Sequence, residues 1–240
     1  MRKHTFVILF ISLMLNSAFA QTEVNSEVIL KTFNWGFRVG FNARNSELYS
    51  IFEDGVKAEN KNITNCVGFQ SNIFGRINIE NIFLQPEVGY NIVRESIQFN
   101  HPTPTSTEEI LLAGKAQDIT LNQHTQSLNS AMLLGYNIVK HDAYLFNVFL
   151  GPNFRYTFLN TFNKGKDNEY KYKTPQYNLN LIAGISANIS YFYFDFRYEI
   201  NIPEKKDFSF EDDDSAPDYL KNIAIRKNEN LLSFSIGMMF

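Results

Sequence analysis

The sequence is poor in several features that mark common protein classes. It has one cysteine, Cys66, among 240 residues, so no disulfide can form within the chain. After residue 20, no apolar run reaches the ~18 residues that a transmembrane helix needs. There is no basic surplus, because 22 lysine and arginine residues stand against 25 acidic ones, and this balance does not favour a nucleic-acid partner. Glycine-rich phosphate loops, paired cysteines and metal-spaced histidines are also missing, so the sequence predicts no cofactor, no metal site and no catalytic residue.

The N-terminus has the features of a secretory signal peptide. Arg2 and Lys3 precede an apolar run over residues 5–15, and Ala18-Phe19-Ala20 supplies small residues at the expected cleavage position. The apolar run is too short to span a bilayer as a helix. We therefore expect a signal peptide over residues 1–20, a short N-terminal periplasmic segment over residues 21–32 and one domain over residues 33–240.

Aromatic residues are abundant and occur in strictly alternating segments. The chain has 23 phenylalanines and 12 tyrosines. In the segment Y-F-Y-F-D-F-R-Y-E-I, Phe194 and Phe196 share one parity while Asp195 and Arg197 share the other, which is typical of a β-strand with two unlike faces. Eight such strands are expected, at about residues 33–42, 67–79, 84–92, 126–139, 144–158, 177–189, 191–200 and 230–240.

The connections between these strands alternate between long and short. Polar stretches at about 43–65, 96–125, 159–175 and 201–229 alternate with tight links near 80–81, 140–142 and residue 190. Outer-membrane barrels have this arrangement, with short periplasmic turns at one end and longer external loops at the other. The predicted fold is therefore all-β, an eight-stranded antiparallel up-and-down transmembrane β-barrel in the outer membrane. Pro86 falls within the third strand and predicts an edge, a bulge or a strand end there.

A soluble lipocalin-like barrel has the same periodicity with its apolar face turned inward. Eight faces rich in phenylalanine and tyrosine exceed the room inside an eight-stranded barrel, and an arginine facing the lipid midplane costs about 2–4 kcal/mol. The charged face is therefore expected to line the lumen. Seven residues are predicted to pair there: Arg38, Arg76, Glu87, Arg155, Asp195, Arg197 and Glu199. Their charges nearly cancel, which favours a structural ion-pair plug over the alternative of a charged pore or substrate site.

Short motifs resemble those of the PorT-like outer-membrane β-barrel family, whose small barrels are common in Bacteroidota. Residues 36–42, G-F-R-V-G-F-N, resemble the first-strand pattern of the family, and residues 84–90, L-Q-P-E-V-G-Y, resemble its third strand. Gly151-Pro152 and the segment L-I-A-G-I at 181–185 are similar to further family positions. The resemblance implies an outer-membrane barrel and implies no catalytic or ligand-binding residue.

Two weaker candidate sites lie in the expected loops. His124 and Ser127 are three residues apart where the second long loop re-enters the barrel, with Glu108 or Asp118 as an orienting carboxylate, and His101 lies nearby in sequence. The acidic run over residues 211–214 offers oxygen ligands for calcium but lacks the glycine spacing of a calcium loop.

The predicted function is that of an integral outer-membrane barrel, non-enzymatic, with long extracellular loops for adhesion, assembly or envelope maintenance. The alternatives are a narrow channel for small solutes, a rim-located lipid-modifying enzyme and a soluble periplasmic lipid-binding barrel. The expected partners are outer-membrane lipid, an envelope protein of unknown identity, and the barrel-assembly machinery, which would recognise the final strand ending in Phe240.

Overall fold

The computed structural model describes residues 31–53, 56–58, 62–100, 118–141, 144–164, 170–172, 176–202, 206–210 and 223–240. The expected signal peptide lies outside these residues. Within these ranges the chain forms eleven strands: β1 (Phe33–Glu53), β2 (Val56–Lys57), β3 (Asn62–Ile79), β4 (Ile82–Asn100), β5 (Asp118–His141), β6 (Tyr144–Lys164), β7 (Tyr170–Lys171), β8 (Gln176–Ile189), β9 (Phe192–Asn201), β10 (Lys206–Ser209) and β11 (Ile223–Met239). No helix among the described residues has the length and apolar character needed to cross a membrane.

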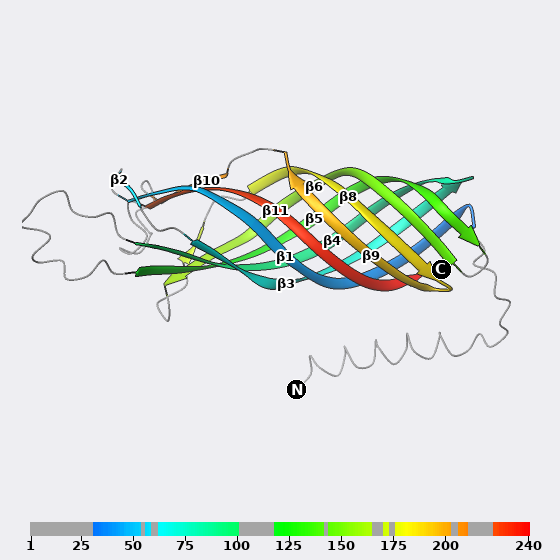
Figure 1. Ribbon diagram of the computed structural model, residues 1–240, viewed down its shortest axis with the longest axis horizontal. Coiled ribbons are helices and arrows are strands. Elements are labelled where there is room, and N and C mark those ends of the chain that lie inside the picture. Colours follow the sequence, from blue (N-terminus) through cyan, green and yellow to red (C-terminus); the bar gives the residue numbers. More distant parts are fainter. Residues whose placement is uncertain are drawn as a thin grey trace, which may run out of the picture.

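Eight long strands form a closed antiparallel ring in the order β1, β3, β4, β5, β6, β8, β9 and β11, and β11 pairs with β1 to close it. Figure 1 shows these strands running obliquely side by side along the long axis, with the end of β11 next to the start of β1. The short strands β2, β7 and β10 extend the sheet at the opposite end, where they pair with β1, β6 and β11. The predicted eight-stranded barrel is confirmed.

The two ends of the barrel differ, and we call them the turn end and the loop end. At the turn end, two-residue links join β3 to β4 and β8 to β9. Their first residues, Glu80 and Ser190, have φ values of 54° and 55°, as tight hairpin turns that match the strand twist require. At the loop end the strands are longer than the sequence predicts. The polar stretches expected to be loops are partly strand, and β5 for example has 24 residues.

The membrane face of the barrel is apolar, as the alternation predicts. Phe196 is 46% exposed, whereas its neighbour Arg197 is 3% exposed. Outward-facing aromatic residues gather in two bands. Trp35 packs against Phe240 with tilted rings near the turn end, and Tyr156 stacks on Tyr177 on the other side of the apolar band. These bands match the aromatic girdles that flank the lipid-facing surface of outer-membrane barrels.

Two prolines interrupt the hydrogen-bond ladder in the middle of the wall. Pro86 lies inside β4 and is flanked by strands on both sides, so the expectation of an edge, a bulge or a strand end is wrong. Because proline has no N–H, the pairing with β3 skips Gly75 and Arg76 and resumes beyond them in the same register. Pro152 of β6 leaves a similar gap in the pairing with β5, at Met132.

Candidate functional site: the barrel interior

A ring of four charged side chains lies in the interior, and we call it the central ion-pair cluster: Arg38 of β1, Glu87 of β4, and Asp195 and Arg197 of β9. Glu87 Oε1 lies 3.0 Å from Arg38 Nη2 and 2.5 Å from Arg197 Nη1. Asp195 Oδ2 lies 3.4 Å from Arg38 Nη1 and 2.7 Å from Arg197 Nη2. Each carboxylate therefore bridges both guanidinium groups, and the cluster carries no net charge.

Neutral polar side chains complete the surroundings of this cluster. Arg38 Nη1 donates to Ser235 Oγ at 3.0 Å, and Gln70 Nε2 donates to the same oxygen at 2.7 Å. Gln85 Nε2 donates to Glu87 Oε2 at 3.3 Å. Buried ions are tolerated when they are paired and hydrogen-bonded, because these contacts offset the cost of removing them from water.

Arg155 of β6 and Glu199 of β9 form a second buried ion pair, with Arg155 Nη2 2.6 Å from Glu199 Oε1. The same oxygen accepts hydrogen bonds from Asn153 Nδ2 at 2.9 Å and from Asn180 Nδ2 at 2.5 Å. Six of the seven predicted lumen residues therefore belong either to the central ion-pair cluster or to this pair.

Arg76 behaves differently from the other six residues. Its side chain is fully buried, but no carboxylate of the described residues lies within ion-pair distance of it. Arg76 Nε donates to Gln85 Oε1 at 2.8 Å, and the guanidinium lies 4.0 Å from the ring centre of Phe83 and 5.6 Å from that of Tyr193. Aromatic faces thus take the place that the sequence assigns to a carboxylate.

The sequence does not predict a second group of charges nearer the loop end, which we call the outer ion-pair cluster: Arg44, Glu95, Lys227 and Glu229. Arg44 Nη1 lies 3.1 Å from Glu229 and 3.5 Å from Glu95, while Lys227 contacts both carboxylates and donates to Gln123. Three of these residues, Arg44, Lys227 and Glu229, fall in stretches expected to be loops, and Glu95 immediately precedes the loop expected at 96–125. The only sequence signal for an inward orientation of these residues is the alternation along each strand, since Arg44 has the same parity as Arg38.

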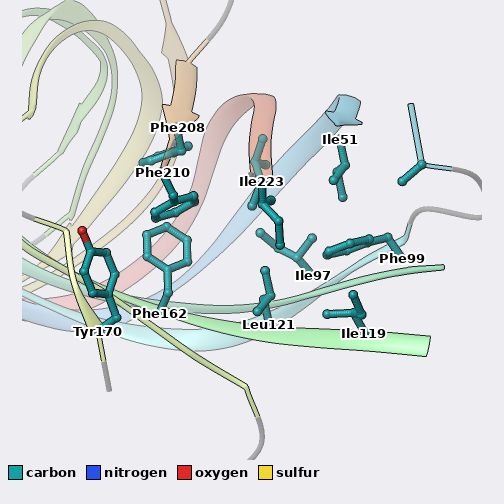
Figure 2. Close-up of a cluster of buried hydrophobic side chains, with 12 residues drawn as sticks. Ile51, Ile97, Phe99, Ile119, Leu121, Phe162, Tyr170, Phe208, Phe210 and Ile223 are labelled. Carbon is teal, nitrogen blue, oxygen red and sulfur yellow. The ribbon is translucent and has the colours of Figure 1, made fainter. Parts of the chain in front are cut away.

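Apolar side chains pack inside the barrel near both ends. Near the turn end, Phe74, Leu145, Tyr193 and Met239 form the turn-end apolar cluster. At the loop end, a larger group forms the outer apolar cluster (Figure 2): Ile51, Ala58, Ile97, Phe99, Ile119, Leu121, Phe162, Tyr170, Phe208, Phe210, Ile223 and Ile225. Phe162 packs against both Phe208 and Phe210, with edge-to-face contacts at 5.7 and 5.1 Å between ring centres.

Between the two ends, a lumen apolar cluster packs beside the ions: Phe83, Ala131, Leu133, Phe149 and Ile182. The guanidinium of Arg197 lies 4.9 Å from the ring centre of Phe149. Gly135 of β5 lies directly opposite Phe83 of the adjacent strand β4, and a Cβ at this glycine would lie 2.0 Å from the phenylalanine ring. A glycine is therefore needed where the ring crosses the neighbouring backbone.

The space between the central ion-pair cluster and the Arg155–Glu199 pair is small. A cavity of about 10 Å³ lies between Arg38, Glu87, Arg197 and Glu199. A single water needs about 10–15 Å³ of such volume. This cavity therefore has room for about one water, and it is far too small for a solute.

The other candidate sites are not assembled by the described residues. Ser127 points into the barrel and is buried, whereas His124 has the opposite parity on β5 and lies on the other face of the wall. The two side chains cannot act as nucleophile and base from opposite faces. His101, Glu108 and the acidic run at 211–214 lie outside the described residues. Within the described ranges, no group of three or more histidine, cysteine, aspartate or glutamate side chains is arranged to hold a metal ion.

Comparison with known proteins agrees with this architecture. A family described as "Outer membrane protein beta-barrel domain" matches residues 19–203, so the chain belongs to this family and is an outer-membrane protein. Among solved structures, the chain is similar to the outer membrane protein OprG from Pseudomonas aeruginosa, with 13% identity, a TM-score of 0.50, and coverage of 88% of this chain and 97% of that chain. This likeness shows a shared fold.

Two further solved structures align at lower scores. Ail, the attachment invasion locus protein of Yersinia pestis, in complex with the heparin analogue sucrose octasulfate, has 12% identity and a TM-score of 0.40 over 88% of this chain and all of that one. Neisserial surface protein A has 11% identity and a TM-score of 0.41 over 87% of this chain and 96% of that one. No curated protein matches this chain.

Proposed function

Because the chain belongs to a family of outer-membrane β-barrels, we propose that it is a closed, non-enzymatic scaffold that holds long loops at the cell surface. The observation that carries this proposal is the filled interior. The central ion-pair cluster leaves a cavity of about 10 Å³, and apolar clusters lie near both ends of the barrel. A solute path through this interior would have to break buried ion pairs and displace packed aromatic rings.

The proposal is tested by conductance. Purified protein is refolded into lipid vesicles, its folded state is checked by heat-modifiable migration in gels, and the same vesicles are fused with a planar bilayer. We expect no stepwise current, because a dry apolar constriction and a neutralised ionic layer both oppose ion entry. Reproducible current steps from folded protein would favour the narrow channel and overturn the closed scaffold.

The proposed role of the loops is to bind a molecule outside the cell, for adhesion, assembly or envelope maintenance. Support comes from the loop end, where β2, β7 and β10 extend the wall and the outer apolar cluster fills it. Cells that produce the full chain are compared with cells that produce a variant shortened within residues 101–117, and envelope proteins captured by cross-linking are identified. A partner lost only with the shortened loop supports the role, and identical capture from both contradicts it.

We also propose that the chain belongs to the PorT-like subgroup, with residues 1–20 as a signal peptide. The third-strand motif L-Q-P-E supports the assignment through its chemistry. Gln85 and Glu87 point inward, where Gln85 links Arg76 to the central ion-pair cluster, while Pro86 faces outward. Mass spectrometry of the mature N-terminus tests the signal peptide, with Gln21 as the expected first residue.

The final strand is proposed to be the segment that the barrel-assembly machinery recognises. Support comes from the alternating outward residues of β11 and from Phe240, which exchanges two backbone hydrogen bonds with Trp35. Replacing Phe240 with serine is expected to lower the folded yield in cells more than the yield of refolding into vesicles, where no machinery is present. Equal losses in both settings would assign Phe240 to barrel closure alone.

A further inference from the structure

The lipid-facing wall contains a hollow, which we call the wall groove. It has a volume of about 690 Å³ and lies over β1, β3, β4, β5, β6 and β8. Its lining includes Trp35, Gly75, Pro86, Ser130, Pro152 and Phe154. Glu87 also borders it, but the side chain of Glu87 points inward and is held by the central ion-pair cluster.

The hollow arises from small outward-facing residues surrounded by large ones. Gly75 lies opposite Trp35 across β1 and β3, and Ser130 lies opposite Val88 on one side and Phe154 on the other. Serine has a short side chain, so the wall is low at Ser130. Gly75 has no side chain, and the ring of Phe33 lies over its backbone, 3.2 Å from where a Cβ would be.

The two prolines lie along the same line. Pro86 of β4 lies opposite Met132 of β5. On the other side of β5, the residue of β6 that lies opposite Met132 is Pro152. The two gaps in the hydrogen-bond ladder, between β3 and β4 and between β5 and β6, therefore open onto this groove. The compact proline rings keep the floor of the groove low where the ladder is interrupted.

The surroundings of the groove determine what can occupy it. Trp35 and Phe154 are about half exposed and belong to the apolar outer face that contacts hydrocarbon. Water is a poor occupant, since an apolar hollow gives it too few hydrogen-bond partners. A second copy of the chain is also a poor fit, because the same concave patch on two subunits would leave a void between them. An acyl chain is flexible, apolar and already present at this depth.

We propose that the wall groove is a binding site for one acyl chain of an outer-membrane phospholipid, which is held there more tightly than the lipid around the rest of the barrel. The proposal rests on the membrane location of the wall and not on the closed interior or the role of the loops. The volume is within the range of about 300–1,000 Å³ that small-molecule sites occupy.

The test uses Trp35, which is the only tryptophan of the chain and lines the groove. Folded protein in detergent micelles is titrated with phosphatidylcholine that carries bromine atoms on one acyl chain, and quenching of tryptophan fluorescence is recorded. We expect saturable quenching, and native mass spectrometry of the same samples is expected to find one retained phospholipid per chain.

A filling variant and a matched control make the test specific. Ser130→Leu fills the groove, and Ala183→Leu adds the same side chain to the outer face of β8, away from the groove. We expect Ser130→Leu to raise the half-saturating lipid concentration about fourfold, equivalent to the contacts of about one methylene group, and Ala183→Leu to leave it unchanged.

Three outcomes would overturn the proposal. The first is quenching of the wild-type protein that rises linearly without saturation, together with no retained lipid. The second is an equal effect of the two leucine variants when both fold to the same heat-modifiable form. The third is a dimer mass that disappears with Ser130→Leu, which would assign the groove to a second copy of the chain.

Discussion

The part of the barrel that spans the membrane and the part that rises beyond it are built from the same strands with opposite polarity. Within the span, ions and neutral polar side chains occupy much of the interior, and residues such as Phe196 face outward. In β4, the span residues Glu87 and Val88 point inward and outward respectively, whereas ten residues further along the inward position is Ile97 and the outward one is the exposed Gln98. The inversion follows the change of solvent on the outer face, from hydrocarbon to water.

The difference shows that inside and outside are not chemically fixed in a β-barrel. We call the part of the barrel beyond the membrane, at the loop end, the extension. Because it lies in water, the extension must bury apolar side chains to be stable, as any soluble domain does, and the outer apolar cluster supplies that core. In the span, lipid already solvates the apolar residues, so the interior is free to be polar as long as each buried ion is paired or, like Arg76, is hydrogen-bonded and packed against aromatic faces. The outer ion-pair cluster is the polar layer nearest to the point where one regime replaces the other.

The largest expected effect comes from breaking the polar core of the span. Glu87→Gln removes the carboxylate that bridges Arg38 and Arg197 and leaves two guanidinium groups with one aspartate. Removing one partner of a buried ion pair costs about 3–5 kcal/mol. We expect a loss of that size in the free energy of unfolding, measured by urea denaturation of the protein in lipid vesicles.

The control for this variant is Glu80→Gln, which makes the same chemical change in the exposed turn between β3 and β4. Its effect is expected to fall below about 1 kcal/mol, as for other exposed charges. Equal stabilities of the two variants would mean that the central ion-pair cluster contributes nothing to the stability of the span.

The second effect concerns the apolar core of the extension. Ile97→Ala leaves a cavity in the outer apolar cluster, and such changes cost about 2–5 kcal/mol. We expect the loss to be confined to the loop end, with faster amide hydrogen exchange at the loop ends of β4 and β5 and unchanged exchange near the turns. Ile92→Ala on the outer face of the same strand is the control. Uniformly faster exchange along the whole of β4 would contradict a separate core.

The sequence predicts the span well because one strand is enough to reveal its two faces. In residues 192–200 the alternation of phenylalanine with Asp195 and Arg197 places the latter inside without knowledge of any neighbour. The sequence does not predict which of these ions pair with one another. Arg38 reaches Glu87 because the stagger of β1, β3 and β4 brings them to one level, and no single strand encodes that stagger.

The sequence predicts loops where the extension has strands. The apolar residues of the extension are few, and they occupy the positions that point into the barrel. Ile97 and Phe99 have the same parity as Glu87, so a pattern that assigns apolar residues to the outside finds polar residues there and predicts a loop. The signal that could reveal these strands is that polar and apolar residues continue to alternate, with the apolar ones now at the inward-facing positions. The sequence also predicts a carboxylate partner for Arg76, whereas the structure has aromatic ones. Partners from β4 and β9 cannot be inferred from the sequence of β3 alone.

The smallest expected effect tests the outer faces of the two regions with one substitution. Leu150→Arg places a charge on the outer face of β6 near the middle of the apolar band, where lipid cannot solvate it, at a cost of about 2–4 kcal/mol. Asn122→Arg places the same side chain on the outer face of β5 beyond the band, where water solvates it, so the stability should stay near that of the wild type. Urea denaturation in vesicles measures both. If the two arginines cost the same, the membrane does not end between these two residues, and the inversion of polarity along the strands needs a cause other than the change of solvent.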